Sequence, residues 1–177
     1  MPQRELLEKS EISLLLDTYD DIFSDFDPRS YTKRALSGDF LEAAQHATRE
    51  TKEGALELHL LLPRKQREKR EEVVIKQRLN QHFRKHAFQL EHQIKHTLHQ
   101  GILITLLGFL FMLIAGLVIF RNPDSFKTQF LRILLEPSGW FMVWFGLDKI
   151  FYGTREVKTN LDFYKKMVKA ELVFDTY

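Results

Sequence analysis

Histidines are concentrated in one short part of this 177-residue chain. Five of the seven lie within eighteen residues, directly before a long uncharged segment. Two pairs have i, i+4 spacing, which places both side chains on one helix face and can suit zinc. However, the chain has no cysteine, no carboxylate shares this face, and no HExxH pattern occurs, so a metal site is the least favoured interpretation. Three interpretations remain for this histidine stripe: a solvated or interfacial polar face, a lumen-lining or pH-responsive surface in an oligomer, and a metal site. The members of the stripe are His82, His86, His92, His96 and His99.

An acidic segment near the N-terminus is the second candidate site. The stretch DTYDDIFSDFDPRSY follows an apolar segment and includes Asp17, Asp20, Asp21 and Asp25. An aspartate at the end of a strand can act as a nucleophile in phosphotransferases of the haloacid dehalogenase type. Those enzymes need a second aspartate two residues later, where this chain has Tyr19, and the EF-hand spacing is also absent. Two hypotheses stay open: a metal-dependent enzyme, and a turn whose carboxylates cap backbone N–H groups.

No other pattern predicts catalysis or a cofactor. Walker A, GxGxxG and GxSxG sequences are all missing. The absence of cysteine excludes disulfides and thiolate metal sites. A formal net charge of +2 does not predict a nucleic-acid partner. We therefore expect a non-enzymatic protein with no catalytic residues and no cofactor.

The elements that would position the histidines are helical and lead into a membrane. Residues 67–100 contain no proline and predict a long basic, histidine-rich helix. Residues 101–120 form a twenty-residue run without a charge. A helix of that length spans about 30 Å, the thickness of the hydrocarbon core of a bilayer. This run is predicted to be the first transmembrane helix, followed by a short extracytoplasmic loop at 121–128.

A second crossing is expected at residues 129–152. Arg132 and Glu136 interrupt this apolar stretch, but their i, i+4 spacing lets them neutralise each other. We expect one continuous helix with a kink near Pro137; the alternative is a short interfacial helix followed by a crossing that starts at Pro137. Basic residues next to the two crossings are concentrated on the side of the long N- and C-terminal segments, so the positive-inside rule places both termini in the cytoplasm.

The remaining segments predict an α/β domain built from both ends of the chain. Residues 1–66 form its first part, with strand patterns at 12–16 and 55–63 and a helix near 37–50. Residues 153–177 supply a helix and a returning strand at 170–174. Because isolated strands are unstable, the last strand is expected to pair with the first two in a sheet of about three strands. The fold class is thus an α/β cytoplasmic domain on a two-helix transmembrane hairpin.

One face of the long helix is predicted to be a close-packing seam. On a helical wheel, apolar residues before the membrane share one sector with small residues inside it. Small residues let transmembrane backbones approach closely. This sector faces either the second crossing or a neighbouring subunit, and within the membrane it holds Gly101, Thr105, Gly108, Met112, Ala115 and also Gly116.

The arrangement resembles a family of small uncharacterised bacterial two-helix inner-membrane proteins. The resemblance rests on the DTYDDIFSDFDPR loop, the LELHLLLP segment, the GWFMVW second crossing and the closing AELVF segment. It implies a multi-pass protein of the bacterial inner membrane and assigns no catalytic residue. The sequence thus favours an oligomeric scaffold or adaptor whose partners are the lipid bilayer and further copies of the chain. The alternative is an oligomeric membrane pore, in line with a more distant similarity to the accessory membrane proteins of type VI-B CRISPR loci and hence to antiphage defence.

Overall fold

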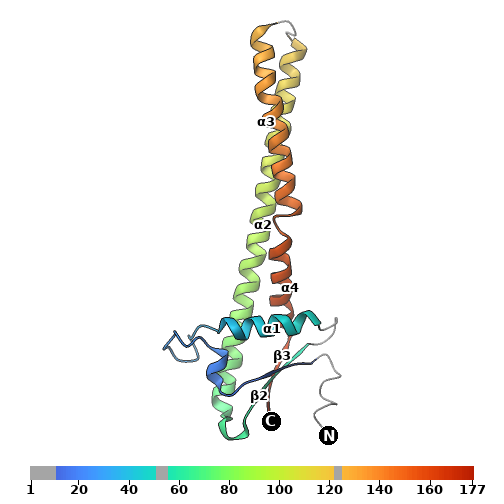
Figure 1. Cartoon of the computed structure of the whole chain (residues 1–177). Coiled ribbons are helices and arrows are strands. Elements are labelled where there is room, and N and C mark those ends of the chain that lie inside the picture. The colour runs from blue at the N-terminus through green and yellow to red at the C-terminus, as the bar shows by residue number, and fades with distance from the viewer. Residues whose placement is uncertain (1–10, 51–55, 122–124) are drawn as a thin grey trace. The chain divides into compact units, whose positions relative to one another are not determined.

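The computed structural model describes residues 11–50, 56–121 and 125–177 (Figure 1). They fall into two compact units. The sheet unit contains the described residues up to Phe88 and the segment Leu161–Tyr177, and the helical unit is Gln89–Asn160. In chain order the elements are β1 (Glu11–Leu15), η1 (Tyr19–Ile22), α1 (Gly38–Glu50), β2 (Glu57–Leu62), η2 (Arg64–Gln66), α2 (Lys69–Arg121), α3 (Phe126–Phe151), α4 (Arg155–Lys169) and β3 (Glu171–Thr176).

Three strands form one parallel sheet in the order β1-β2-β3. β2 lies in the centre, with Leu60 opposite Leu14 of β1 and Phe174 of β3. Parallel neighbours cannot be joined by a tight turn, so a helical connection lies between each pair of strands. The first connection contains α1, and the second contains α2, α3 and α4. A small sheet built from both ends of the chain, within a largely helical protein, is therefore confirmed.

Alternation along the strands determines which face of the sheet is buried. The even-numbered strand residues include Ile12, Leu58 and Leu172, all of them buried. Side chains alternate across a strand, so one face of the sheet is apolar and is covered by helices. The helices contribute Phe40 and Ala44 of α1, Ile75, Leu79 and Phe83 of α2, and Phe163 and Met167 of α4 to the same core.

In the helical unit, α3 runs alongside α2 in the opposite direction. Gly101 of α2 faces Gly146 of α3, while Gly108, two turns later, faces Gly139, seven residues earlier in α3. α3 is continuous across Pro137, and the kink expected at this residue stays a prediction. α2 is one long helix whose part from Gly101 on is apolar, and the predicted loop at 121–128 falls partly on residues outside those described.

Candidate functional site

The predicted small-residue seam lies against α3. A Cβ atom added to Gly101 would be 2.9 Å from the carbonyl oxygen of Gly146, and one added to Gly108 would be 2.7 Å from that of Gly139. The Thr105 hydroxyl donates a hydrogen bond to the Gly101 carbonyl (2.9 Å) and lies where a side chain on Gly146 would go. Glycine is therefore required for the close approach of the two helices.

The far part of the seam is only partly enclosed. Met112 lies against Gly139, and Ala115 is 4% exposed. Gly116, which the wheel also placed in this sector, is exposed, and an added Cβ would meet nothing within 4 Å. Gly116 lies 100° further around the helix than the buried Ala115 and takes no part in the contact with α3.

The outer surface of the helical unit is apolar. Large apolar side chains at least 38% exposed cover most turns of α2 after Gly101 and much of α3. On α2 they are Ile102, Leu103, Leu106, Leu107, Phe109, Leu110, Leu113, Ile114, Leu117 and Phe120. By length and composition, α2 is the helix among those described that could cross a membrane, and little of its apolar part is buried. This unit has small residues inside and large apolar residues outside, the reverse of a water-soluble core.

Charged residues on α3 are few and largely matched. Arg132 Nε donates to Glu136 Oε2 at 3.1 Å, one helical turn away. Near the other end, Lys149 Nζ donates to Gln100 Oε1 of α2 (3.1 Å) and lies 5.6 Å from the centre of the Phe145 ring. Arg132 and Lys149 therefore each have a partner that reduces the cost of placing them beside apolar surface.

The histidine stripe separates into two groups. His82 and His86 lie in the sheet unit with ring centres 4.2 Å apart, and His86 stacks on Tyr164 of α4 at 5.2 Å. His82 Nε2 is buried without a hydrogen-bond partner. Burial, together with the positive charges of His86, Arg78 and Lys85, lowers the pKa of His82 to about 4. Its ring is therefore neutral at physiological pH.

The second group, His92, His96 and His99, is exposed on α2 within the helical unit. Across the described part of the chain, no three His, Asp or Glu side chains come together in a way that could hold a metal ion. The first two members of the stripe belong to a packed aromatic cluster, and the last three are surface residues.

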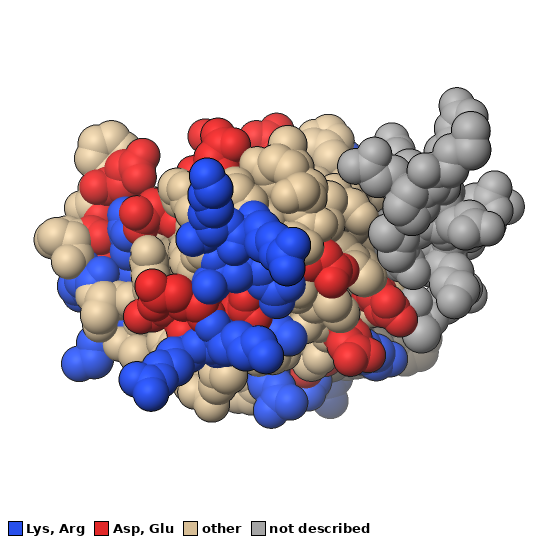
Figure 2. All heavy atoms as spheres, turned by 90° about the horizontal axis from the view of Figure 1, so that it is seen from below, with Lys and Arg blue, Asp and Glu red and all other residues tan. Residues whose placement is uncertain are grey.

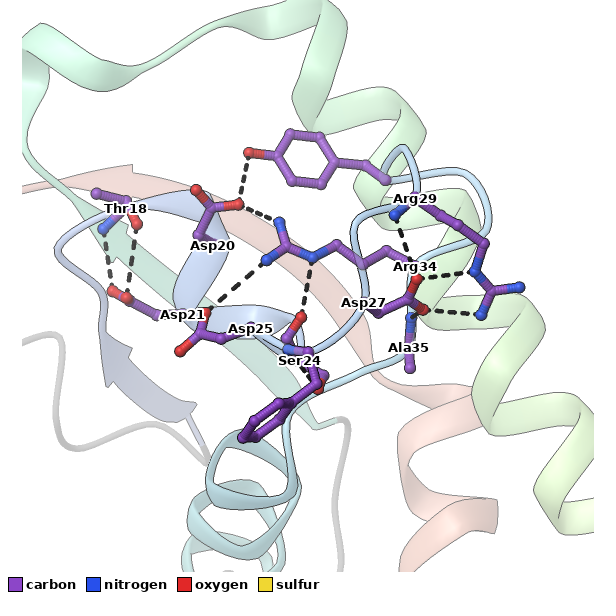
Figure 3. Close-up of polar contacts among 11 residues, drawn as sticks. Thr18, Asp20, Asp21, Ser24, Asp25, Asp27, Arg29, Arg34 and Ala35 are labelled. Carbon is purple, nitrogen blue, oxygen red and sulfur yellow. Dashed lines mark hydrogen bonds and ion pairs between the residues drawn. The ribbon is translucent and has the colours of Figure 1, made fainter.

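The carboxylates of the acidic segment mainly form hydrogen bonds and ion pairs within their own loop (Figure 3). Asp21 Oδ2 accepts hydrogen bonds from the backbone N–H groups of Asp17 (2.7 Å) and Thr18 (3.0 Å). Asp27 accepts from the Ala35 N–H (2.7 Å) and pairs with both Nε and Nη2 of Arg29. These bonds correspond to the capping hypothesis, in which acidic side chains satisfy backbone donors in a turn.

Arg34 connects the two ends of this loop. Its guanidinium pairs with Asp20, lies 3.8 Å from Asp25, and donates from Nε to the Ser24 carbonyl at 3.1 Å (Figure 3). An antiparallel bridge between Phe23 and Leu36 closes the loop below it. The sequence offered no way to identify Arg34 as the partner, since it lies 14 residues after Asp20 and many basic residues were available.

The fastened loop exposes one large aromatic side chain. Phe26 is 98% exposed, whereas Phe23, three residues earlier, is 2% exposed and belongs to the core. Rigid exposed aromatic residues are common anchors of protein–protein contacts. Phe26 is a functional candidate that sequence reasoning missed, because a phenylalanine in an alternating acidic stretch reads as a buried residue.

Sequence analysis also failed to identify two further polar clusters. His59 of β2 is 7% exposed, with Nδ1 2.6 Å from Asp175 of β3 and Nε2 3.1 Å from Glu57. Ser13 of β1 lies next to His59 in the sheet. Carboxylates contact both ring nitrogens of His59, so this histidine is not placed to act as a base on the Ser13 hydroxyl. The register that brings Asp175 to His59 joins residues 116 apart in the chain.

The second cluster lies where η2 meets α2. Arg67 pairs with Glu72 (2.7 Å), and Tyr19 donates to the same carboxylate (3.3 Å) while accepting from the Glu68 N–H (3.0 Å). The hydrogen bond from Arg67 lowers the pKa of Glu72. This cluster connects the acidic loop to the start of α2 and has a structural role.

Basic side chains gather near the middle of the face shown in Figure 2. η2 and the first turn of α2 lie on this side of the sheet unit, and they contribute the exposed side chains Arg64, Lys65, Lys69 and Arg70. Such a surface attracts acidic partners.

No family model, curated protein or solved structure matches this chain. The functional interpretation therefore depends on the geometry described above.

Proposed function

We propose that this chain is a two-pass membrane protein that holds the sheet unit at the cytoplasmic surface of a bacterial inner membrane and acts there as an adaptor. The carrying observation is the reversed distribution of side chains in the helical unit, with glycines between the helices and large apolar residues outside. In water, so extensive an apolar surface would lead to association, whereas lipid solvates it.

α2 has the length and composition of a transmembrane helix, and α3, which packs against it, is proposed as the second crossing. Residues 101–120 of α2 match the hydrocarbon core in length. On α3, the Arg132–Glu136 pair lies near the proposed outer end, and Pro137 is tolerated in transmembrane helices because neighbouring groups satisfy the freed carbonyl. β2 precedes α2 and β3 follows α4 in one sheet, so an even number of crossings is the topology compatible with that pairing.

A pair of arginine substitutions on α2 tests the membrane proposal. Leu106 and Val73 are both apolar and similarly exposed, at 60% and 56%, but Val73 lies in the sheet unit. An arginine in the centre of a transmembrane helix costs about 2.5–3.5 kcal/mol. Leu106→Arg should therefore reduce the amount of protein that stays in membranes after carbonate extraction, while Val73→Arg should not. The proposal fails if the wild-type chain is released by carbonate, or if Leu106→Arg stays in the membranes as fully as Val73→Arg.

The adaptor role is supported by the surfaces that the sheet unit offers. Its acidic loop is fastened by ion pairs and carries the exposed Phe26, and its η2 region is basic. If Phe26 anchors a partner, Phe26→Ser should dissociate a complex purified in mild detergent. Phe88→Ser, at a residue 70% exposed on α2, is the matched control. A chain that purifies with no other protein, with or without Phe26, would contradict the adaptor role.

An oligomeric pore is the second candidate. It draws on the exposed stripe His92, His96 and His99, but α3 occupies the small-residue face that the sequence offered for subunit contacts. Mass measurement in nanodiscs separates the alternatives, because a single copy per disc excludes both the pore and a homo-oligomeric scaffold.

A further inference from the structure

A shallow hollow of about 560 Å³ lies where α3 ends and α4 begins. It is lined by Trp144, Leu147, Asp148, Phe151, Tyr152 and Arg155. These residues follow one another at spacings of three, one, three, one and three, so on a helical path they occupy one face. All of them belong to the helical unit.

Three aromatic rings dominate the lining and have little protein over them. Trp144, Phe151 and Tyr152 are 66%, 68% and 69% exposed. Aromatic side chains of this kind are enriched at the level of lipid headgroups, where one part of the ring is in apolar surroundings and another in water. In the proposed topology this end of α3 lies at the cytoplasmic surface of the bilayer.

The hollow also contains one acidic and one basic side chain. Asp148 and Arg155 are exposed, and neither forms an ion pair with another described residue. By contrast, Arg132, Glu136 and Lys149 of α3 each have a partner. The free pair thus offers an acceptor for a cation and a planar donor for a phosphate within one aromatic-lined site.

We propose that this hollow binds the headgroup of a zwitterionic phospholipid that carries a primary ammonium, such as phosphatidylethanolamine. The Asp148 carboxylate accepts hydrogen bonds from the ammonium, the Arg155 guanidinium binds the phosphate, and Trp144 and Phe151 lie along the upper part of the acyl chains. The inference rests on the proposed membrane crossing of α3.

Charge complementarity favours this lipid over two others. An anionic phospholipid without an amine would bring negative charge to Asp148 with nothing to offset it. A phosphatidylcholine headgroup has a quaternary ammonium with no N–H, so it would attract Asp148 without donating a hydrogen bond. A primary ammonium next to a phosphate satisfies both side chains.

The two tryptophans of the chain provide a local test. The Trp140→Phe variant reports from Trp144 inside the hollow, and the Trp144→Phe variant reports from Trp140, which does not line it. Each variant is reconstituted in phosphatidylcholine vesicles that contain equal fractions of acyl-brominated phosphatidylethanolamine, phosphatidylglycerol or phosphatidylcholine. Bromine quenches nearby indole fluorescence, so stronger quenching by one lipid at Trp144 measures its enrichment there.

We expect brominated phosphatidylethanolamine to be preferred at Trp144 by about two- to fivefold, the range expected from one exposed charged contact, with no preference at Trp140. In the Trp140→Phe background, Asp148→Asn should remove this preference. Glu156→Gln, next to the site but not lining it, should retain it.

Three results would overturn the inference: equal quenching by all three lipids, a preference for phosphatidylglycerol, or a preference that survives Asp148→Asn. Failure of every brominated lipid to quench either tryptophan would instead refute the membrane crossing itself, and so distinguishes the two proposals.

Discussion

A methyl group at Gly108 should separate the two long helices. Its Cβ would lie 2.7 Å from the Gly139 carbonyl oxygen and 2.8 Å from both the backbone nitrogen and Cγ2 of Val143. Two of these three atoms belong to the backbone, so a rotamer change cannot relieve the overlap. We expect α3 to move away from α2 and to lose contacts along the seam.

Gly116→Ala is the matched control. It lies on the same helix, eight residues later, and an added Cβ meets nothing within 4 Å. Replacing glycine by alanine favours the helix by up to about 1 kcal/mol at either position. That contribution cancels in the comparison, which leaves the overpacking cost of about 1–3 kcal/mol at Gly108. Gly108→Ala should therefore be less stable than Gly116→Ala by about this amount.

Reversible unfolding in mixed micelles, with increasing SDS and helix content followed by circular dichroism, measures this difference. Gly139→Ala should also destabilise, since its Cβ would lie 2.7 Å from Met112 Cγ and 2.9 Å from the Gly108 carbonyl oxygen. The double variant should lose less unfolding free energy than the two single variants lose together, because one separation of the helices relieves both overlaps. Equal unfolding curves for Gly108→Ala and Gly116→Ala would refute the close contact.

Other predictions concern the sheet unit. Phe23→Ala should lower the unfolding free energy by about 3–5 kcal/mol, because the ring is 2% exposed. Phe26→Ala, at 98% exposure, should leave denaturant unfolding unchanged. Similar losses of stability in the two variants would mean that the loop has another conformation. Acidification from pH 6.5 towards 4 should lower the melting temperature, because the His82 pKa is about 4 in the folded protein and the unfolded chain therefore binds the proton first. His82→Leu should flatten the dependence of the melting temperature on pH in this range. An unchanged slope in that variant would contradict the assignment of this effect to His82. Millimolar Mg²⁺ or Ca²⁺ should not raise the melting temperature, because Asp20, Asp21 and Asp27 are engaged in the loop; a rise that Asp21→Asn abolishes would reveal a metal site instead.

β2 was predictable because local alternation determines it. Leu56, Leu58 and Leu60 repeat every second residue, and this pattern identified β2 to within two residues at each end. The parallel direction and the register depend on contacts between distant segments. The pairing of His59 with Asp175 follows from that register alone, so no local pattern could have revealed it.

The histidine stripe shows the limit of a helical wheel. The wheel correctly separated these residues from the apolar face of α2, since Phe83 is fully buried in the core. It could not show that Tyr164 of α4 stacks on His86, because a wheel contains no information about neighbouring elements. The wheel therefore treated His82 and His99 alike, although the structure buries an atom of the first and exposes the second.

The acidic loop was predictable in kind but not in detail. Aspartates after a strand favour capped turns, and Asp21 caps two backbone donors. The partner of Asp20 and the exposure of Phe26 depend on how Arg34 folds back across the loop. A sequence contains the charges, but their pairing is decided by the path of the chain between them.

Two-sided labelling tests the membrane topology most directly. The chain has no cysteine, so each single-cysteine variant carries one reporter. Ser125 precedes α3, Ser30 lies in the acidic loop and Thr159 in α4, and all three are exposed. In intact bacterial spheroplasts, a membrane-impermeant maleimide should label Ser125→Cys at once, and should label Ser30→Cys and Thr159→Cys only after the membrane is opened. Labelling of all three from the same side would contradict the two-pass account.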